Sequence, residues 1–117
     1  MPHLLLEYTD NTVIKPSEVL LRLNQVLIES GEFEPGHIKS RACCLHDYCI
    51  GSGEDEAFVH LTLSLLSGRS MAVKAALAER LLAALQPLVS AEVRLQMTCD
   101  VRELARDCYG KAVREAE

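Results

Sequence analysis

The chain has 117 residues, of which 49% are apolar and 25% are charged, and its formal net charge is −5. This composition is typical of one globular domain. It excludes a chain that is disordered throughout and disfavours binding to nucleic acid or to an anionic membrane. The amino-terminal segment has no basic stretch before its short apolar run, so we expect no secretion signal and a cytoplasmic location. The five cysteines are an odd number without C-x-x-C spacing, which indicates reduced thiols rather than a zinc site.

The first half of the chain predicts a strand, a helix and a second strand. Residues 3–8 form a short apolar run that is typical of a strand buried on both faces. Residues 15–30 carry a leucine stripe at helical spacing, and Gly31 follows as a residue that commonly ends a helix. After a turn at residues 34–36, residues 38–50 predict a less regular strand.

The second half repeats this order of elements. Residues 57–66 alternate between apolar and polar side chains, which predicts a strand with one buried face. Ser70 is a candidate N-cap for a long helix that extends to about Leu88. Residues 93–99 alternate again and predict the last strand. The charged tail, residues 101–117, has room for one short helix.

These elements predict an α/β (α+β) fold built from two consecutive β-α-β units. The units cover residues 2–50 and 57–100 of a single domain, 1–117, and their similar length indicates an internal duplication. Right-handed crossovers would give a four-stranded sheet with both helices on one face. The other face would carry Phe58, His60 and Thr62, and we expect other subunits to cover it.

Pro2 is the candidate reactive residue. Removal of Met1 would leave Pro2 with a free secondary amine at the start of the first strand. Nearby cations disfavour the protonated form of an amine and lower its pKa, and a neutral amine can take a proton from a carbon next to a carbonyl group. A proline in second position is also common in proteins where it has no catalytic role.

Four segments of the chain resemble the 5-carboxymethyl-2-hydroxymuconate isomerase family of the tautomerase superfamily. They are residues 2–8, 38–41, 57–63 and 68–70, in the order of that family. The resemblance implies a homotrimer in which an amino-terminal proline is the general base. The reaction implied is a 1,3-keto–enol proton shift on an unsaturated 2-hydroxy or 2-oxo dicarboxylic acid such as 5-carboxymethyl-2-hydroxymuconate, within homoprotocatechuate breakdown. It implies a small di- or tricarboxylate substrate and neither a metal nor an organic cofactor.

The resemblance also identifies three candidate substrate-binding cations. Arg69 matches the arginine of the Gly-Arg-Ser turn in that family, and Arg41 matches the second cation of its Ile-Arg-Ser-Arg run. Lys39 stands where the run usually has its first arginine. A lysine keeps the charge but loses the planar fork of a guanidinium, so the substrate preference or the rate can differ from the family pattern.

Two alternatives remain open from the sequence. The same fold and base could serve another 2-keto acid such as phenylpyruvate, a possibility that Lys39 raises. Alternatively, a chain that retains Met1 has no free proline amine, because the nitrogen of Pro2 is then an amide. Such a chain would be a trimeric small-molecule-binding module without catalysis.

Overall fold

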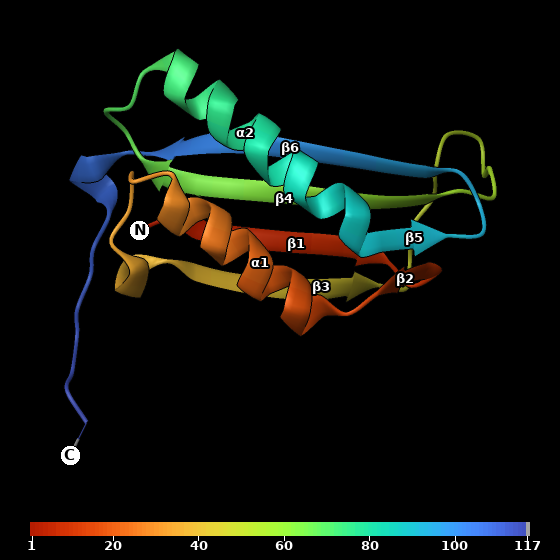
Figure 1. The fold of residues 1–117 in the computed structure, drawn as a ribbon, viewed down its shortest axis with the longest axis horizontal. Coiled ribbons are helices and arrows are strands. Elements are labelled where there is room, and N and C mark those ends of the chain that lie inside the picture. The colour runs from red at the N-terminus through yellow and green to blue at the C-terminus, as the bar shows by residue number, and fades with distance from the viewer. Residues whose placement is uncertain (117) are drawn as a thin grey trace.

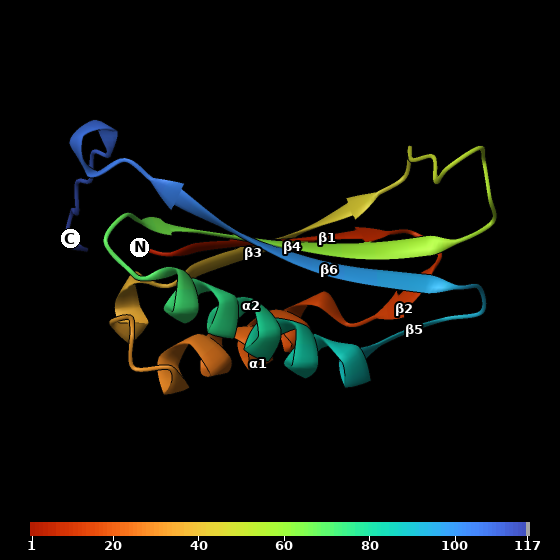
Figure 2. The same cartoon turned by 90° about the horizontal axis from the view of Figure 1, so that it is seen from above.

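The chain folds into two layers, a four-stranded sheet and a pair of helices that pack on one of its faces (Figures 1 and 2). The computed structural model describes residues 1–116. The strand order in the sheet is β3-β1-β4-β6. This arrangement confirms the α+β fold class that the sequence predicts. The sheet contains β1 (His3–Thr9), β3 (Lys39–Leu45), β4 (Ala57–Leu66) and β6 (Leu95–Leu104).

The sheet contains two β-α-β units joined side by side. Strands β1 and β3 are parallel and are connected through helix α1 (Pro16–Glu29), while β4 and β6 are parallel and are connected through α2 (Met71–Leu85). The two units meet where β1 pairs with β4 in the antiparallel direction. The start of β1 therefore lies beside the end of β4, a relationship that positions the candidate site described below.

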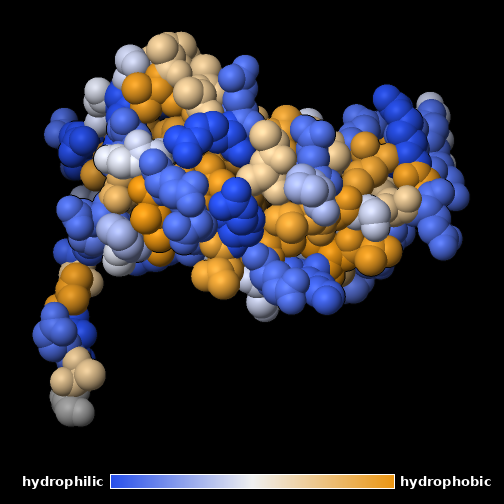
Figure 3. All heavy atoms as spheres, viewed as in Figure 1, coloured by the Kyte–Doolittle hydropathy of each residue, from blue (hydrophilic) through white to orange (hydrophobic). Residues whose placement is uncertain are grey.

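The core lies between the sheet and the helices and is mainly aliphatic. In β4 the alternate residues Leu61, Leu63 and Leu65 are fully buried. They pack in one cluster with the buried stripes of the helices, which include Leu23 of α1 and Leu81 of α2. The outer surfaces of the helices carry many polar atoms, whereas apolar atoms gather toward the ends of the helices that lie near the small β2–β5 sheet (Figure 3).

The predicted helix signals act as expected at two positions. The Ser70 side chain accepts a 3.2 Å hydrogen bond from the Val73 amide and caps α2. Gly31 follows α1 with a φ of +74°, a conformation that favours glycine. Helix α2 ends at Leu85, before the predicted end near Leu88. The next residues form a one-turn 3₁₀ helix, η2 (Gln86–Leu88), because Pro87 cannot continue the α-helical hydrogen bonds.

Two predicted strand boundaries were wrong, and in both cases the pairing partner sets the true length. Strand β3 ends at Leu45 rather than at Ile50, because its neighbour β1 ends at the residue paired with Leu45, Thr9. Strand β6 continues to Leu104 rather than ending at Cys99, because β4 pairs with it along all ten residues. The sequence analysis places the charged residues of this extension in the tail.

The sequence analysis also missed a second, two-stranded sheet. Strand β2 (Thr12–Ile14) pairs in the antiparallel direction with β5 (Val89–Ala91) and joins the loop after β1 to the segment after α2. Three residues are too few to show a periodic pattern. Two single-turn 3₁₀ helices complete the fold: η1 (Pro35–His37) and η3 (Arg106–Cys108), the latter being the short helix expected in the tail.

The face of the sheet opposite the helices is open in the single chain (Figure 2). Phe58, His60 and Thr62 alternate with the buried residues of β4 and are partly exposed on this face. The described residues include no helix that is both long and apolar enough to cross a membrane.

Candidate active site

The beginning of the chain lies in a cavity of about 360 Å³ at one end of the sheet. The strand pairing explains why distant segments meet there: the starts of β1 and β3 lie beside the ends of β4 and β6. The loop between β4 and α2 and the tail after β6 complete the wall. The lining residues are Met1, His37, Leu66, Arg69, Arg106, Tyr109 and Lys111.

The amino group of Met1 is held within this cavity. It donates a 3.1 Å hydrogen bond to the carbonyl oxygen of His37. Pro2 is buried, and its carbonyl oxygen accepts a 3.1 Å hydrogen bond from the Lys39 amide. Burial lowers the pKa of the Met1 amino group below its usual value, and the positive charges of Lys39, Lys111 and Arg69 lower it further. The surroundings of the chain start therefore favour a neutral amine.

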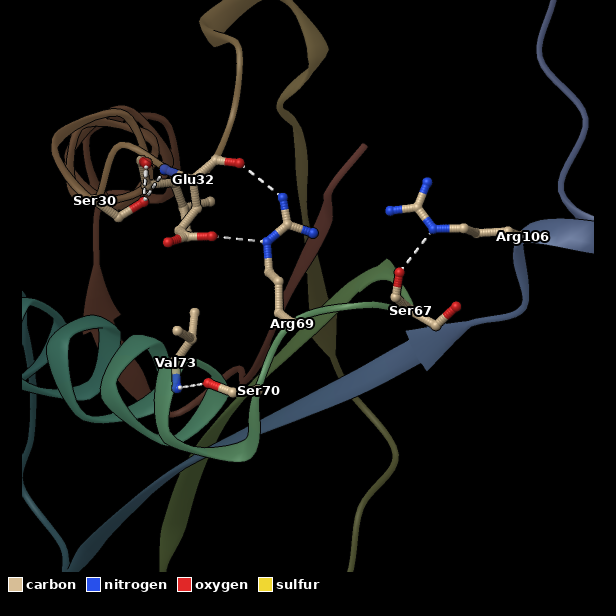
Figure 4. Close-up of polar contacts among 8 residues, drawn as sticks. Ser30, Glu32, Ser67, Arg69, Ser70, Val73 and Arg106 are labelled. Carbon is tan, nitrogen blue, oxygen red and sulfur yellow. Dashed lines mark hydrogen bonds and ion pairs between the residues drawn. The ribbon is translucent and has the colours of Figure 1, made fainter.

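Arg69 enters the cavity from the loop before α2. Its Nε donates to Glu32 Oε1 at 3.0 Å and its Nη2 donates to the Glu32 carbonyl oxygen at 2.7 Å (Figure 4). Its guanidinium carbon lies 4.6 Å from the centre of the Phe33 ring, within the range of a cation–π contact. The side chain is 23% exposed. Arg69 is thus fixed in place, and Glu32 occupies part of its hydrogen-bonding fork.

The other two predicted cations lie outside the cavity wall. Lys39 Nζ donates to the His37 carbonyl oxygen at 3.1 Å, so its charge lies near the Met1 amino group. Arg41 Nη1 lies 3.2 Å from His3 Nδ1, on the neighbouring strand. The structure thus brings Pro2, Arg69 and Lys39 to one end of the sheet and places Arg41 against His3.

The tail contributes three lining residues that the sequence analysis did not single out. Arg106 Nε donates to the Ser67 carbonyl oxygen at 2.7 Å, and its guanidinium faces the same space as that of Arg69 (Figure 4). Tyr109 Oη lies 3.1 Å from His3 Nε2, and Lys111 follows in the tail. These contacts join residues that are 39 and 106 positions apart. The density of charge in the tail was the only available signal, and it carried no information on position.

Elsewhere in the described residues we find fewer groups that could take part in a reaction. A second hollow, of about 330 Å³, lies between α1 and the β2–β5 sheet, but Lys15 and Glu18 are its only charged lining residues. Residues 1–116 contain no group of three or more His, Cys, Asp or Glu side chains that could hold a metal ion. The chain start, with its amine and several cations, is therefore the best candidate for an active site.

Comparison with known proteins identifies the family of the chain. The family model for 5-carboxymethyl-2-hydroxymuconate isomerase matches residues 2–113. No curated protein sequence matches the chain significantly.

Among solved structures, a 5-carboxymethyl-2-hydroxymuconate isomerase from Deinococcus radiodurans R1 is 32% identical, with a TM-score of 0.85 over 97% of this chain and 90% of that chain. A 5-carboxymethyl-2-hydroxymuconate delta-isomerase is 24% identical, with a TM-score of 0.67 over 100% of this chain and 87% of that one. A fused 4-OT, described as a symmetric trimer, shares the fold at 16% identity, with a TM-score of 0.74 over 94% of this chain and 91% of that chain. The chain therefore belongs to the 5-carboxymethyl-2-hydroxymuconate isomerase family and is an isomerase of the tautomerase type.

Proposed function

We propose that the chain catalyses a 1,3-proton shift on a small unsaturated di- or tricarboxylic acid with a 2-hydroxy or 2-oxo group, such as 5-carboxymethyl-2-hydroxymuconate. The base is the nitrogen of Pro2, which becomes a free secondary amine once Met1 is removed. The observation that supports this assignment is the lowered pKa of the amino group at the chain start, caused by burial and by nearby cations. A lowered pKa raises the fraction of the amine that is neutral, and only the neutral amine can accept a proton.

The cations of the cavity wall are proposed to bind the carboxylates of the substrate. Arg69, Arg106 and Lys111 line the cavity, and two of them are arginines, whose planar fork suits a carboxylate. Lys39, one step further from the cavity, acts through its charge on the amine. The base takes a proton from one end of the conjugated system and returns one to the other end. The substrate is thereby isomerised with no net change in its protons.

We also propose that three copies of the chain assemble, with the open face of each sheet covered by its neighbours. The partly exposed Phe58 on that face supports this proposal, since an isolated domain gains by burying such surface. Two fused 4-OT structures that share the fold are described as trimers. Sedimentation equilibrium distinguishes a trimer of this 12.9 kDa chain from a monomer.

Two alternatives have an observation in their favour. Lys39 stands where the family usually has an arginine, and an ammonium group lacks the planar donor fork of a guanidinium. This difference supports another 2-keto acid such as phenylpyruvate as the substrate. The amino group of Met1 already occupies the cavity and bonds to His37, which supports a binding module without catalysis wherever Met1 is retained. Relative kcat/KM values over a panel of enolisable acids distinguish another 2-keto acid from 5-carboxymethyl-2-hydroxymuconate as the substrate. The intact mass distinguishes a chain that retains Met1, the binding module, from one that has lost it.

The test of the proposed function is the variant Pro2→Ala, compared with wild type after the loss of Met1 has been verified by intact mass. The variant keeps an amine at the chain start, but this primary amine lacks the ring that fixes the direction of the Pro2 nitrogen. We expect kcat to fall about 10²-fold or more, which is the lower range for the loss of a positioned base. Pro87→Ala is the matched control, because it makes the same change in η2, away from the cavity lining. Wild-type turnover that survives in Pro2→Ala would remove the proline from the mechanism.

A further inference from the structure

His3 connects Arg41 to Tyr109 in a chain of two hydrogen bonds beside Pro2. Arg41 Nη1 lies 3.2 Å from His3 Nδ1, and His3 Nε2 lies 3.1 Å from Tyr109 Oη. A guanidinium only donates hydrogen bonds, so Nδ1 must be the acceptor in the first contact. The proton of a neutral imidazole is then on Nε2, which donates to Tyr109 Oη. Burial and the charge of Arg41 lower the pKa of His3, in agreement with a neutral ring.

This arrangement determines what the Tyr109 hydroxyl can do. Its oxygen accepts the hydrogen bond from His3, so its own hydrogen must point in another direction. Among residues 1–116, His3 is the only hydrogen-bond partner that the structure gives to this oxygen. Tyr109 lines the cavity together with Met1, and the His3 and Tyr109 rings lie edge to face at 6.4 Å. A substrate in the cavity would therefore meet a neutral O–H donor close to the amine.

We propose that Tyr109 is a catalytic residue that donates a hydrogen bond to the 2-oxygen of the substrate, and that His3 and Arg41 position its hydroxyl. This inference rests on the proposed function. When the base removes the proton of a 2-hydroxyl group, the electron pair of the O–H bond stays on the 2-oxygen; when it removes a proton from carbon in a 2-oxo substrate, the pair of the C–H bond delocalises onto that oxygen. Both routes give an enolate. The Tyr109 hydrogen bond stabilises that charge while its proton stays on Tyr109. The charge leaves the oxygen when the base returns a proton to the far carbon.

The cavity then has two kinds of hydrogen-bond donor with different roles. Arg69 and Arg106 are permanent cations, and they attract the carboxylates equally before and during the reaction. The neutral hydroxyl of Tyr109 strengthens its contact only as the charge develops, so it contributes to kcat rather than to binding. Loss of the cations should therefore raise KM, and loss of the hydroxyl should lower kcat.

The test begins with Tyr109→Phe, which removes the hydroxyl and keeps the ring. We expect kcat to fall about 10²-fold, as for the loss of one preorganised donor to an oxyanion, with KM changed less than about 3-fold. Tyr48→Phe is the matched control, because the Tyr48 hydroxyl bonds to Asp10 at the opposite end of the sheet. We expect this control to keep the wild-type kcat.

The positioning role of His3 is tested with two further variants. His3→Gln should retain most of kcat, since an amide can accept from Arg41 and donate to Tyr109. His3→Leu should lose as much of kcat as Tyr109→Phe. When both changes are combined, kcat should fall no further than in Tyr109→Phe alone, because the two residues act through one hydrogen bond.

The outcomes separate this proposal from the proposed function. Wild-type protein without turnover of any enolisable acid would overturn the proposed function, and this inference with it. Active wild type with an unchanged kcat in Tyr109→Phe would overturn this inference alone. Losses of kcat that multiply in the double variant would overturn the positioning role of His3 and leave Tyr109 as an independent donor.

Discussion

The negative charge of Glu32 partly neutralises the positive charge of Arg69, the cation that is proposed to bind the substrate. Removal of this negative charge should therefore strengthen substrate binding. The Glu32 carboxylate accepts a hydrogen bond from Arg69 Nε at 3.0 Å. Glu32→Gln keeps an oxygen in the same place as a hydrogen-bond acceptor and removes the negative charge. Arg69 would keep its second contact, to the Glu32 carbonyl oxygen at 2.7 Å, and its position over Phe33. We therefore expect Arg69 to stay in place and to attract a substrate carboxylate more strongly.

The size of this effect follows from Coulomb's law. A substrate carboxylate bound on the other side of the guanidinium would lie about 7 Å from the Glu32 carboxylate, and the repulsion would be about 0.6 kcal/mol in water and about 2.4 kcal/mol at an effective dielectric constant of 20. The Arg69 and Glu32 side chains are 23% and 34% exposed, so solvent screens the pair and the lower part of this range applies. Glu32→Gln should lower KM roughly 3- to 10-fold.

The assay is steady-state kinetics at a pH where the base is neutral, together with calorimetric titration of an unreactive dicarboxylate. Glu54→Gln is the control, because it makes the same change of net charge in the exposed loop before β4. We expect KM and Kd to fall together in Glu32→Gln and to stay constant in Glu54→Gln. A KM that rises, or that changes equally in both variants, would refute a direct effect of Glu32 on substrate binding through Arg69.

Two further predictions concern groups whose pKa is shifted. If Pro2 is the base and shares the lowered pKa of the chain start, kcat/KM should rise with pH through that pKa and then level off. Lys111→Gln removes one of the charges that lower the pKa, so the midpoint of the rise should move to higher pH in a pH–rate profile. Burial, with a smaller effect of Asp100, raises the pKa of the Cys99 thiol to about 11, so Cys99 holds almost no thiolate at neutral pH. In timed alkylation followed by peptide mass spectrometry, the exposed Cys43 and Cys108 should react before the half-buried Cys99. Labelling of Cys99 as fast as that of Cys43 would contradict its raised pKa.

The sequence predicted those parts of the fold whose signals are local. The alternation in residues 57–66 gave the bounds of β4, and the serine at position 70 gave the start of α2. Features that depend on a partner far along the chain were not predicted. The end of β6 at Leu104 is set by its pairing with β4, and β2 is a strand only because β5 lies beside it.

The candidate site likewise has residues that the sequence could predict and residues that it could not. Pro2 and Arg69 follow from their place beside a strand or a turn that resembles the family, and the structure places both at the same end of the sheet. The contact of Arg41 with His3 and the place of Tyr109 in the cavity wall depend on side-chain directions and on a tail without periodicity. A sequence pattern carries no information on either.

The acidic net charge of the chain is compatible with an anionic substrate because the charges are unevenly distributed. Arg69, Arg106 and Lys111 line one cavity, and Lys39 lies near the amine, so positive charge is concentrated at one end of the sheet. The acidic loop, residues 54–56, lies before β4 and therefore at the opposite end. The field that a substrate meets depends mainly on charges within about 8 Å at physiological salt, so the local cations outweigh the total of −5. The same cations that lower the pKa of the amine thus also draw the anion toward it, and one cluster of charge serves both the base and the binding site.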